Sequence, residues 1–297
     1  MNRLKLITGP MRVPFLLLAP VCVVLGTGTA VGEVGHLSLF SALLALVGGV
    51  TAHISVNALN EYVDCVSGLD ARTQRTPFSG GSGVLPQQPE MARVGLITGL
   101  VALTVTALIG VYFAIERGWG ILPLGLLGVL VIVAYTPWLT RRPLLCLLAP
   151  GLGFGTLMVM GTHFVLTGHY SWGSFVASLV PFFLVNDLLL LNQFPDRDAD
   201  RSVGRKHILI VLGPRRSSVI YGVFLGAVYL AILTGVGTGL LPRLSSLGLL
   251  TLPLAIPTMI GVYRHADEIP RLLPYLALNV ILNLATPVLV AIGFFVQ

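Results

Sequence analysis

Two short segments of the sequence place amide and carboxylate side chains at intervals of four residues. The first contains Asn60 and Asp64, and the second contains Asn192, Asp196 and Asp200. Residues four apart lie on one face of a helix, so each segment predicts a ladder of side-chain oxygen atoms. Because clustered carboxylates repel one another unless a cation lies between them, the two ladders predict bound metal. Mg²⁺ is the expected ion, since it takes oxygen ligands and joins carboxylates to substrate phosphates.

Further polar residues accompany the ladders: Asn57, Asp70, Arg72, Arg75 and Lys206. Arginine forks and a lysine ammonium both suit phosphate oxygens. The glycines of the stretch Ser79-Gly80-Gly81-Ser82-Gly83 let the backbone approach a ligand closely. A solvated loop face is the simpler interpretation of one such ladder. Two copies, each at the end of an apolar segment, favour a pair of metal-binding motifs that could hold a diphosphate.

The elements that must position these residues are membrane helices. Hydrophobic residues make up 55% of the 297 residues and charged residues only 10%, whereas a soluble domain carries about 25% charged residues. A spanning helix needs about 20 mostly apolar residues. We therefore predict an all-α, polytopic membrane protein that forms one domain over residues 1–297. Nine spans are expected, at 14–32, 37–60, 94–115, 119–138, 144–167, 172–193, 217–240, 245–263 and 273–296.

Basic residues predict the orientation of these spans. With the N-terminus in the cytoplasm, all but two of the 18 Lys and Arg residues fall on the cytoplasmic side, and only Arg117 and Arg243 fall outside. Cytoplasmic loops carry such an excess in membrane proteins. We expect both ladders and two long loops, at about 61–93 and 194–216, to lie on the cytoplasmic side. The expected membrane is the inner membrane of a prokaryotic cell. Membrane topology also accounts for the net charge of +6 without a nucleic-acid partner.

Other residues inside the predicted spans admit two roles. Ionisable side chains are rare there and mark functional sites. His53 lies one turn before Asn57, and Asp187 has His163 or His53 as its candidate partner; active-site and structural roles are both open. The run Gly151–Gly155 has no preceding strand and no basic partner. It predicts close helix packing instead of a nucleotide-binding loop.

The two motifs resemble those of the UbiA superfamily of intramembrane prenyltransferases, in helix count, motif order and motif spacing over essentially the whole chain. The second motif has the form NxxxDxxxD. In the first, Asp70 follows Asp64 by six residues instead of four, and Glu61 replaces an aspartate often found after Asn60. This shape resembles the 1,4-dihydroxy-2-naphthoate prenyltransferases of menaquinone biosynthesis. The stretch Ala134-Tyr135-Thr136-Pro137, followed by Arg141, resembles the family's Tyr-Ser/Thr motif.

The resemblance implies Mg²⁺-dependent transfer of a polyprenyl group from a polyprenyl diphosphate to an aromatic acceptor. It implies that the bundle holds the isoprenoid tail and opens to membrane lipid. The implied metal ligands are Asn60, Asp64, Asp196 and Asp200, and the implied catalytic set is Asp64, Asp70, Asp196 and Asp200. The implied substrate-binding residues are Asn57, Asn60, Arg72, Arg75, Asn192, Lys206 and Tyr135.

Three alternatives stay open at this point. Within the UbiA superfamily, the acceptor could instead be 4-hydroxybenzoate, homogentisate, chlorophyllide or a glycerol-lipid. A CDP-alcohol phosphatidyltransferase would carry its acidic motif in one segment, whereas the two motifs here lie about 130 residues apart. A transporter would place ionisable residues at the bilayer midplane and show inverted repeats. Most charges of this chain fall at one membrane surface, which disfavours transport.

Overall fold

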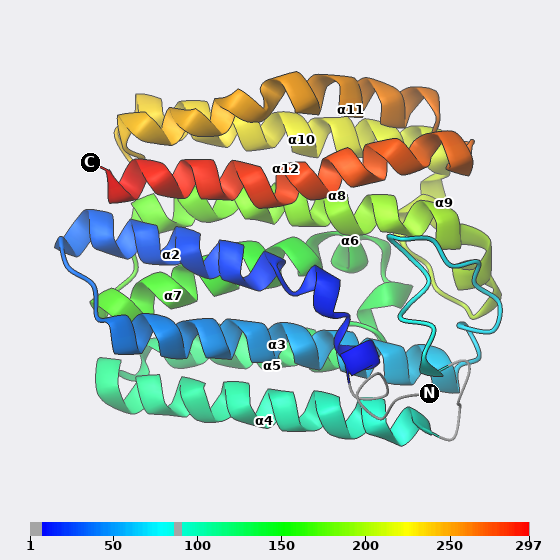
Figure 1. Ribbon diagram of the computed structural model, residues 1–297, viewed down its shortest axis with the longest axis horizontal. Coiled ribbons are helices and arrows are strands. Elements are labelled where there is room, and N and C mark those ends of the chain that lie inside the picture. Colours follow the sequence, from blue (N-terminus) through cyan, green and yellow to red (C-terminus); the bar gives the residue numbers. More distant parts are fainter. Residues whose placement is uncertain (1–7, 86–90, 297) are drawn as a thin grey trace.

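The computed structural model describes residues 8–85 and 91–296, and every regular element in these ranges is a helix (Figure 1). The all-α prediction is confirmed. Arg3 and Lys5 of the predicted cytoplasmic charges lie outside the described residues, as do residues 86–90 of the first predicted loop. The elements are η1 (Val13–Phe15), α2 (Leu18–Val34), α3 (Leu39–Val66), α4 (Ala92–Arg117), η4 (Trp119–Ile121), α5 (Leu122–Ala134), η5 (Leu139–Arg141), α6 (Pro143–Gly151), η6 (Leu152–Leu157), α7 (Met158–Thr167), α8 (Trp172–Ser202), α9 (Ile208–Leu212), α10 (Pro214–Gly237), η7 (Arg243–Thr251), α11 (Leu252–Arg264) and α12 (Ile269–Phe295).

The predicted count of nine spans requires correction. Seven helices of the described chain are long and apolar enough to cross a membrane. The first predicted span is a pair, Thr8–Phe15 and Leu18–Val34, bent by 55°, which makes eight if the pair is one span. The predicted span 119–138 is the shorter helix Trp119–Ala134. It stops early because Pro137 disfavours a helical residue before it, and residues 135–138 form a turn.

The two motif loops are also shorter than predicted. Helix α3 runs on to Val66 and α8 runs on to Ser202, so the loops begin near residues 67 and 203 instead of 61 and 194. Hydropathy marks where a helix leaves the apolar layer, whereas backbone hydrogen bonds continue the helix into polar sequence. Both acidic ladders therefore lie almost wholly on helices.

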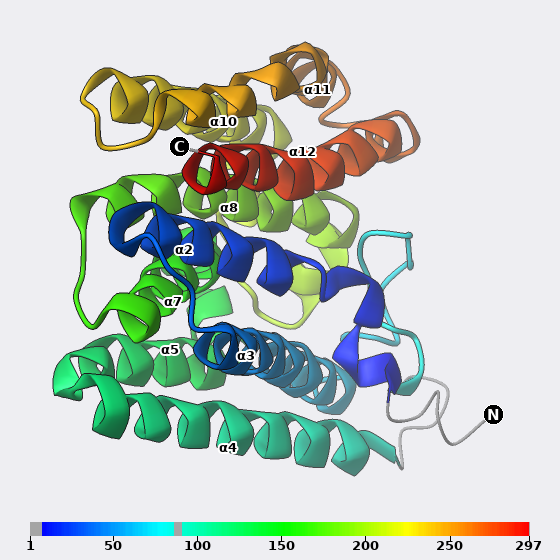
Figure 2. The ribbon, with the colours of Figure 1, turned by 60° about the vertical axis from the view of Figure 1, so that its left-hand side comes forward.

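Helix α8 lies in the middle of the bundle. It contacts α10 and α12 on one side and α2, α6 and η6 on the other. Figure 2 shows α10, α11 and α12 together beyond α8, and α3, α4 and α5 together at the opposite side. The predicted close packing at the glycine run is confirmed. A Cβ atom on Gly155 would lie 2.4 Å from the Phe182 backbone nitrogen, so η6 packs directly on the α8 backbone.

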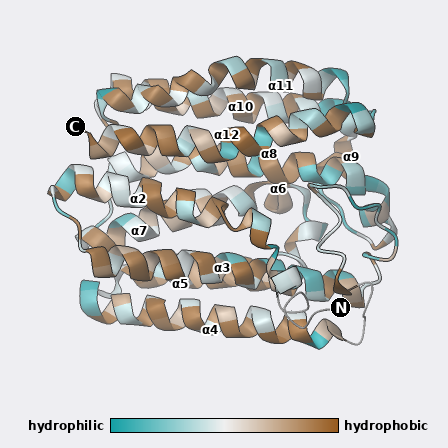
Figure 3. Cartoon of the chain, in the orientation of Figure 1, coloured by the Kyte–Doolittle hydropathy of each residue, from teal (hydrophilic) through white to brown (hydrophobic). Residues whose placement is uncertain are grey.

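The outer surface of the bundle is apolar along most of its length. Large hydrophobic side chains point outward from α4, α5 and α10, and Ile115 is 73% exposed. A water-soluble protein does not expose an apolar surface of this extent. Figure 3 shows hydrophobic residues along the helices and hydrophilic residues gathered near the ends. The protein is an integral membrane protein.

Candidate active site

The two acidic ladders lie at the same end of the bundle. Helices α3 and α8 both end there, and Figure 1 shows the loop after α3 beside the turn from α8 into α9. Asn60 and Asp64 occupy the last turns of α3, and Asn192, Asp196 and Asp200 occupy the last three turns of α8. The helical spacing that predicted each ladder therefore holds, and the fold brings the two ladders together.

Arg205 links the two ladders. Helix α8 ends before Gly204, whose φ of +82° turns the chain back. The Arg205 guanidinium donates one hydrogen bond to Asp64 and another, of 2.8 Å, to Asp200 Oδ1. Burial lowers the pKa of Arg205, but the carboxylates of Asp64 and Asp200 outweigh burial, and the pKa is raised. His207 Nε2 lies 2.9 Å from the second Asp200 oxygen. Neither Arg205 nor His207 was among the predicted site residues.

The glycine-rich loop contacts the second ladder and Glu61, which adjoins the first ladder. The Gly80 N–H donates to Asp196 Oδ2 at 3.2 Å, and the Ser82 N–H donates to Glu61 Oε1 at 2.7 Å. Gly81 lies between these two donors with a φ of +68°. A Cβ there would stand 2.8 Å from Glu61 Oε1 and 3.4 Å from Asp70 Oδ1. The loop therefore needs glycine at this position to reach the carboxylates.

Arg12 forms hydrogen bonds with the first ladder and with the adjoining Glu61. Its guanidinium donates to Glu61 Oε1 and to Asn60 Oδ1, both at 2.8 Å. The Asn60 amide in turn donates to Thr136 Oγ1 at 3.0 Å. From sequence, Arg12 was interpreted only as a charge that sets topology, because nothing local connects it to Asn60, 48 residues away. Thr136 did belong to the predicted Tyr-Ser/Thr motif, whereas the expected substrate contact in that motif was Tyr135.

Two carboxylate oxygens of the site lack a donor. Asp70 Oδ2 and Asp196 Oδ1 are buried and accept no hydrogen bond from the described part of the chain. The pKa of Asp70 is raised to about 7 by burial and by the nearby Asp64 and Glu61 carboxylates. Buried carboxylate oxygens without a hydrogen-bond donor are suitable ligands for a cation. A set of ligands made only of oxygen atoms suits Mg²⁺.

The predicted basic residues differ in their contacts. Arg72 is exposed and donates to the backbone oxygen of Ser202, at 3.3 Å, so it joins the first loop to the end of α8. Arg75 donates to the Ser82 carbonyl at 2.5 Å and so supports the glycine-rich loop. Lys206 is exposed beside Arg205, and its backbone N–H donates to Thr140. All three lie at the end of the bundle that carries the ladders.

A cavity of about 700 Å³ opens beside the ladders and extends into the bundle. Five of the predicted site residues line it: Asn57, Asn60, Arg75, Tyr135 and Asn192. The four predicted catalytic aspartates are not among its lining residues, whereas Arg12 and Ser82, which contact Glu61, are. Further in, the lining is mostly apolar and comes from α3, α5, η6 and α7. The site thus joins a polar mouth to an apolar interior.

The family of the chain follows from its sequence match. A model described as the UbiA prenyltransferase family matches residues 18–295. The chain belongs to the UbiA prenyltransferase family. It is therefore a prenyltransferase, and the resemblance found in the two motifs is confirmed over nearly the whole chain.

Relatives within the UbiA family agree with this assignment. The chain is 26% identical to a 1,4-dihydroxy-2-naphthoate octaprenyltransferase of Bacillus subtilis, over 74% of this chain and 70% of the relative. It is 30% identical to the protein of the same name in Escherichia coli, over 68% of this chain and 67% of the relative. A solved UbiA homolog from Archaeoglobus fulgidus, bound to GPP and Mg²⁺, shares the fold with a TM-score of 0.61 at 14% identity, covering 95% of this chain and 98% of that one.

The structure shows the surroundings of His53 and Asp187, two ionisable residues of the predicted spans. His53 is buried, lines the cavity, and meets the Phe154 ring edge-on with centroids 4.5 Å apart. Asp187 is fully buried, and neither of its carboxylate oxygens accepts a hydrogen bond from a described residue. The predicted pairing of Asp187 with His163 or His53 is therefore wrong, and His163 instead contacts Thr29 and Glu33 at the other end of the bundle.

Proposed function

We propose that this enzyme transfers a polyprenyl group from a polyprenyl diphosphate to 1,4-dihydroxy-2-naphthoate, with Mg²⁺, in menaquinone biosynthesis. The observation that carries the reaction type is the joining of two acidic ladders beside the mouth of one cavity with an apolar interior. The acceptor rests on the names of the two bacterial relatives and on the spacing of Asp64 and Asp70. The whole chain acts as one domain in this proposal.

The metal would be held by Asn60, Asp64, Asp196 and Asp200. The fit rests on the unpaired Asp196 oxygen and on the neighbouring Asp70 oxygen, both buried. The related A. fulgidus structure is bound to GPP and Mg²⁺, which supports a divalent metal in this fold. When bound, Mg²⁺ neutralises the negative charge that develops on a diphosphate leaving group.

The remaining residues bind and orient the two substrates. Arg72, Arg75 and Lys206 supply positive charge for diphosphate oxygens. Asn57, Asn192 and Tyr135 present polar atoms at the cavity mouth, where the reacting ends of both substrates would meet. The apolar lining beyond them suits an isoprenoid tail and excludes water from the allylic carbon. Water exclusion matters because water would otherwise compete with the aromatic ring for that carbon.

The site faces the cytoplasm in this proposal. The excess of basic residues lies at the end of the bundle that holds both ladders. Of the two exceptions, Arg117 ends α4 and Arg243 begins η7, and both elements meet the opposite end in Figure 1. By the positive-inside rule, the end of the bundle that carries both ladders then faces the cytoplasm. The expected location is the inner membrane of a prokaryotic cell.

A transfer assay with purified enzyme in lipid tests this function. The enzyme receives a polyprenyl diphosphate together with one acceptor from a panel: 1,4-dihydroxy-2-naphthoate, 4-hydroxybenzoate, homogentisate, chlorophyllide or a glycerol-lipid. Each reaction runs with Mg²⁺ or with EDTA. We expect prenylated naphthoate only with Mg²⁺. Turnover with only a different acceptor would support prenyl transfer but reject 1,4-dihydroxy-2-naphthoate as the acceptor. Full activity in EDTA would reject the requirement for Mg²⁺.

A further inference from the structure

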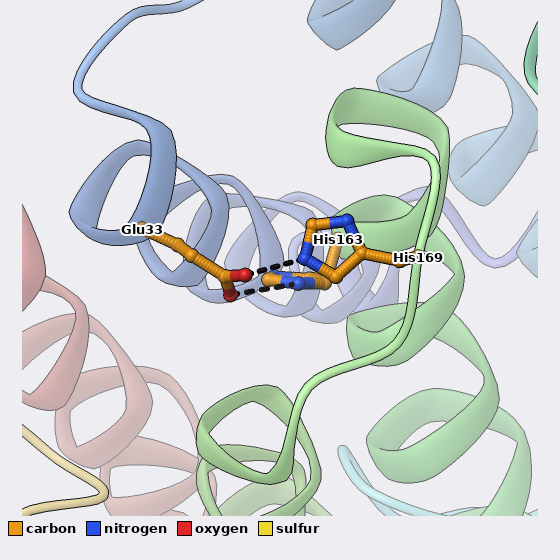
Figure 4. A group of neighbouring side chains, drawn as sticks. All are labelled: Glu33, His163 and His169. Atoms are coloured by element: carbon orange, nitrogen blue, oxygen red, sulfur yellow. Dashed lines mark hydrogen bonds and ion pairs between the residues drawn. The ribbon is translucent and has the colours of Figure 1, made fainter.

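A second cluster of ionisable side chains lies at the end of the bundle opposite to the acidic ladders. Glu33 stands near the end of α2, His163 stands on α7, and His169 stands in the linker between α7 and α8 (Figure 4). One carboxylate oxygen and one nitrogen from each ring lie within 4.8 Å of one another. None of the three residues contributes to the active site described above.

The local structure explains why the two histidines meet. Helix α7 ends at Gly168, whose φ of +88° lets its N–H bond back to the Phe164 carbonyl. A left-handed glycine of this kind reverses the chain at a helix end. The turn brings the His169 ring to 5.9 Å from the His163 ring, nearly perpendicular to it. Figure 4 shows that both rings point toward the carboxylate of Glu33.

The proton on His163 is assigned by its hydrogen bonds. Thr29 Oγ1 donates its only proton to the Gly26 carbonyl at 2.8 Å. In this arrangement Thr29 Oγ1 accepts from His163 Nδ1, 3.0 Å away. A neutral His163 then presents the lone pair of Nε2 toward Glu33 Oε2, at 3.3 Å. His163 is fully buried, and Nε2 makes no hydrogen bond to any residue that the structure describes.

A lone pair that faces a carboxylate is repulsive unless a proton or a metal cation lies between them. The second Glu33 oxygen already contacts His169 Nε2, so both rings converge on one carboxylate. We propose that Glu33, His163 and His169 form a binding site for Zn²⁺ or a similar divalent transition metal. Two imidazole nitrogens and one carboxylate oxygen are a frequent zinc ligand set, with water in the fourth position.

The surroundings of the cluster suit such a site. A histidine that binds metal donates its other ring N–H to an outer partner, as His163 does to Thr29. The side chains of Glu33 and His169 are 37% and 53% exposed, so an ion can reach the site from solvent. A bound ion would link α2, α7 and the following linker, and would stabilise the folded bundle because it binds only the folded chain. This inference does not depend on the proposed acceptor or on the Mg²⁺ site.

Zinc binding by the purified full-length enzyme tests the proposal. Protein stripped of metal with EDTA is titrated with Zn²⁺ in competition with a chromophoric zinc indicator, in excess Mg²⁺ to occupy the acidic ladders. The wild type should bind one Zn²⁺ and gain thermal stability. Glu33→Gln and His169→Ala should each weaken binding at least about tenfold, since loss of even an outer partner weakens metal sites by about 10–100-fold. Both residues are partly exposed, so these changes leave the core intact.

His36→Ala is the matched control, because His36 is exposed near the same end and, among the residues that the structure describes, bonds only the neighbouring Val34 carbonyl. It should bind Zn²⁺ as the wild type does. Zinc K-edge absorption of the wild type adds a measurement that needs no variant, and nitrogen and oxygen ligands at about 2.0–2.1 Å are expected. Wild-type affinity in both Glu33→Gln and His169→Ala would overturn the proposal. So would a wild type that binds no Zn²⁺, or an absorption spectrum without nitrogen ligands.

Discussion

Arg205 and Asp64 lie 141 residues apart in the chain and form an ion pair in which Asp64 is buried and Arg205 is partly buried. The same guanidinium donates to Asp200 at 2.8 Å. One cation therefore serves a carboxylate from each of the two ladders and holds the end of α3 against the end of α8. The acidic site of this UbiA enzyme is assembled across helices by an arginine that belongs to neither motif.

Removing Arg205 should destabilise the protein in the absence of metal. Arg205→Ala leaves two buried carboxylates without their cation, and breaking a buried pair costs about 3–5 kcal/mol. Addition of Mg²⁺ should raise the Tm of this variant more than that of the wild type, because the ion restores positive charge. Thermal unfolding in EDTA and in Mg²⁺ measures both effects. Arg197→Ala is the control, since within the described parts of the chain Arg197 pairs only with the exposed Asp198. Equal Mg²⁺ shifts in the Arg205 variant and the wild type would contradict the prediction.

Loss of a ladder carboxylate should abolish most of the activity. Asp64→Asn and Asp196→Asn should each lower kcat/KM at least about 100-fold, since removing one preorganised contact to developing charge costs about 10²–10³ in rate. Asp198→Asn on the same helix should stay near the wild type, because its side chain is 80% exposed. Steady-state transfer at saturating Mg²⁺ provides the comparison. Near-normal turnover in Asp196→Asn would show that Asp196 of α8 is not a ligand in the proposed metal site.

Gly81 should be required for its contact with Glu61 and not only for its backbone conformation. Gly81→Ala brings a methyl group to 2.8 Å from Glu61 Oε1, whereas Gly68→Ala, at a similar φ of +72°, meets nothing within 4 Å. Both substitutions cost about 1–2 kcal/mol, because each places an alanine in the left-handed backbone conformation. Only Gly81→Ala should raise the KM for the diphosphate substrate. Parallel kinetics of the two variants separate contact from strain, and equal losses would assign the whole effect to strain.

Asp70 should make the stability of the metal-free protein depend on pH. Its pKa is raised to about 7 in the folded protein and is about 3.9 in an unfolded chain. Between these values the folded state binds the additional proton, so the free energy of unfolding falls as pH rises from about 4 to about 7. Thermal unfolding in EDTA across this range should show a smaller fall in Asp70→Asn than in the wild type. An identical fall in both proteins would show that Asp70 ionises normally.

The cavity should determine how long an isoprenoid tail the enzyme accepts. Gly125 lines the cavity, and a Cβ there meets nothing within 4 Å. Gly125→Leu should therefore fill the apolar interior and shift the preference toward shorter diphosphates. Gly226→Leu is the control, since Gly226 also faces open space but lies on α10 and does not line the cavity. Competition between diphosphates of different length measures the shift. An unchanged preference in Gly125→Leu would exclude this cavity as the tail site.

Part of the active site could be predicted because its signals are local. Asn60 and Asp64, and Asn192, Asp196 and Asp200, share helix faces by spacing alone. Their position at the ends of apolar segments followed from hydropathy. The exact span count did not, since hydropathy does not record the turn at residues 135–138 that ends the fourth predicted helix.

The class of the protein can be predicted from its sequence, because composition and four-residue spacing are properties of short segments. They suffice for membrane helices, two oxygen ladders and the UbiA resemblance. The folded structure is needed to show that Arg205 joins the ladders, that Arg12 bonds Asn60, and that Glu33 meets His163 at the opposite end. These contacts join residues between 48 and 141 positions apart. Such pairings depend on how helices pack against one another, and helix packing leaves no periodic signal in a single sequence.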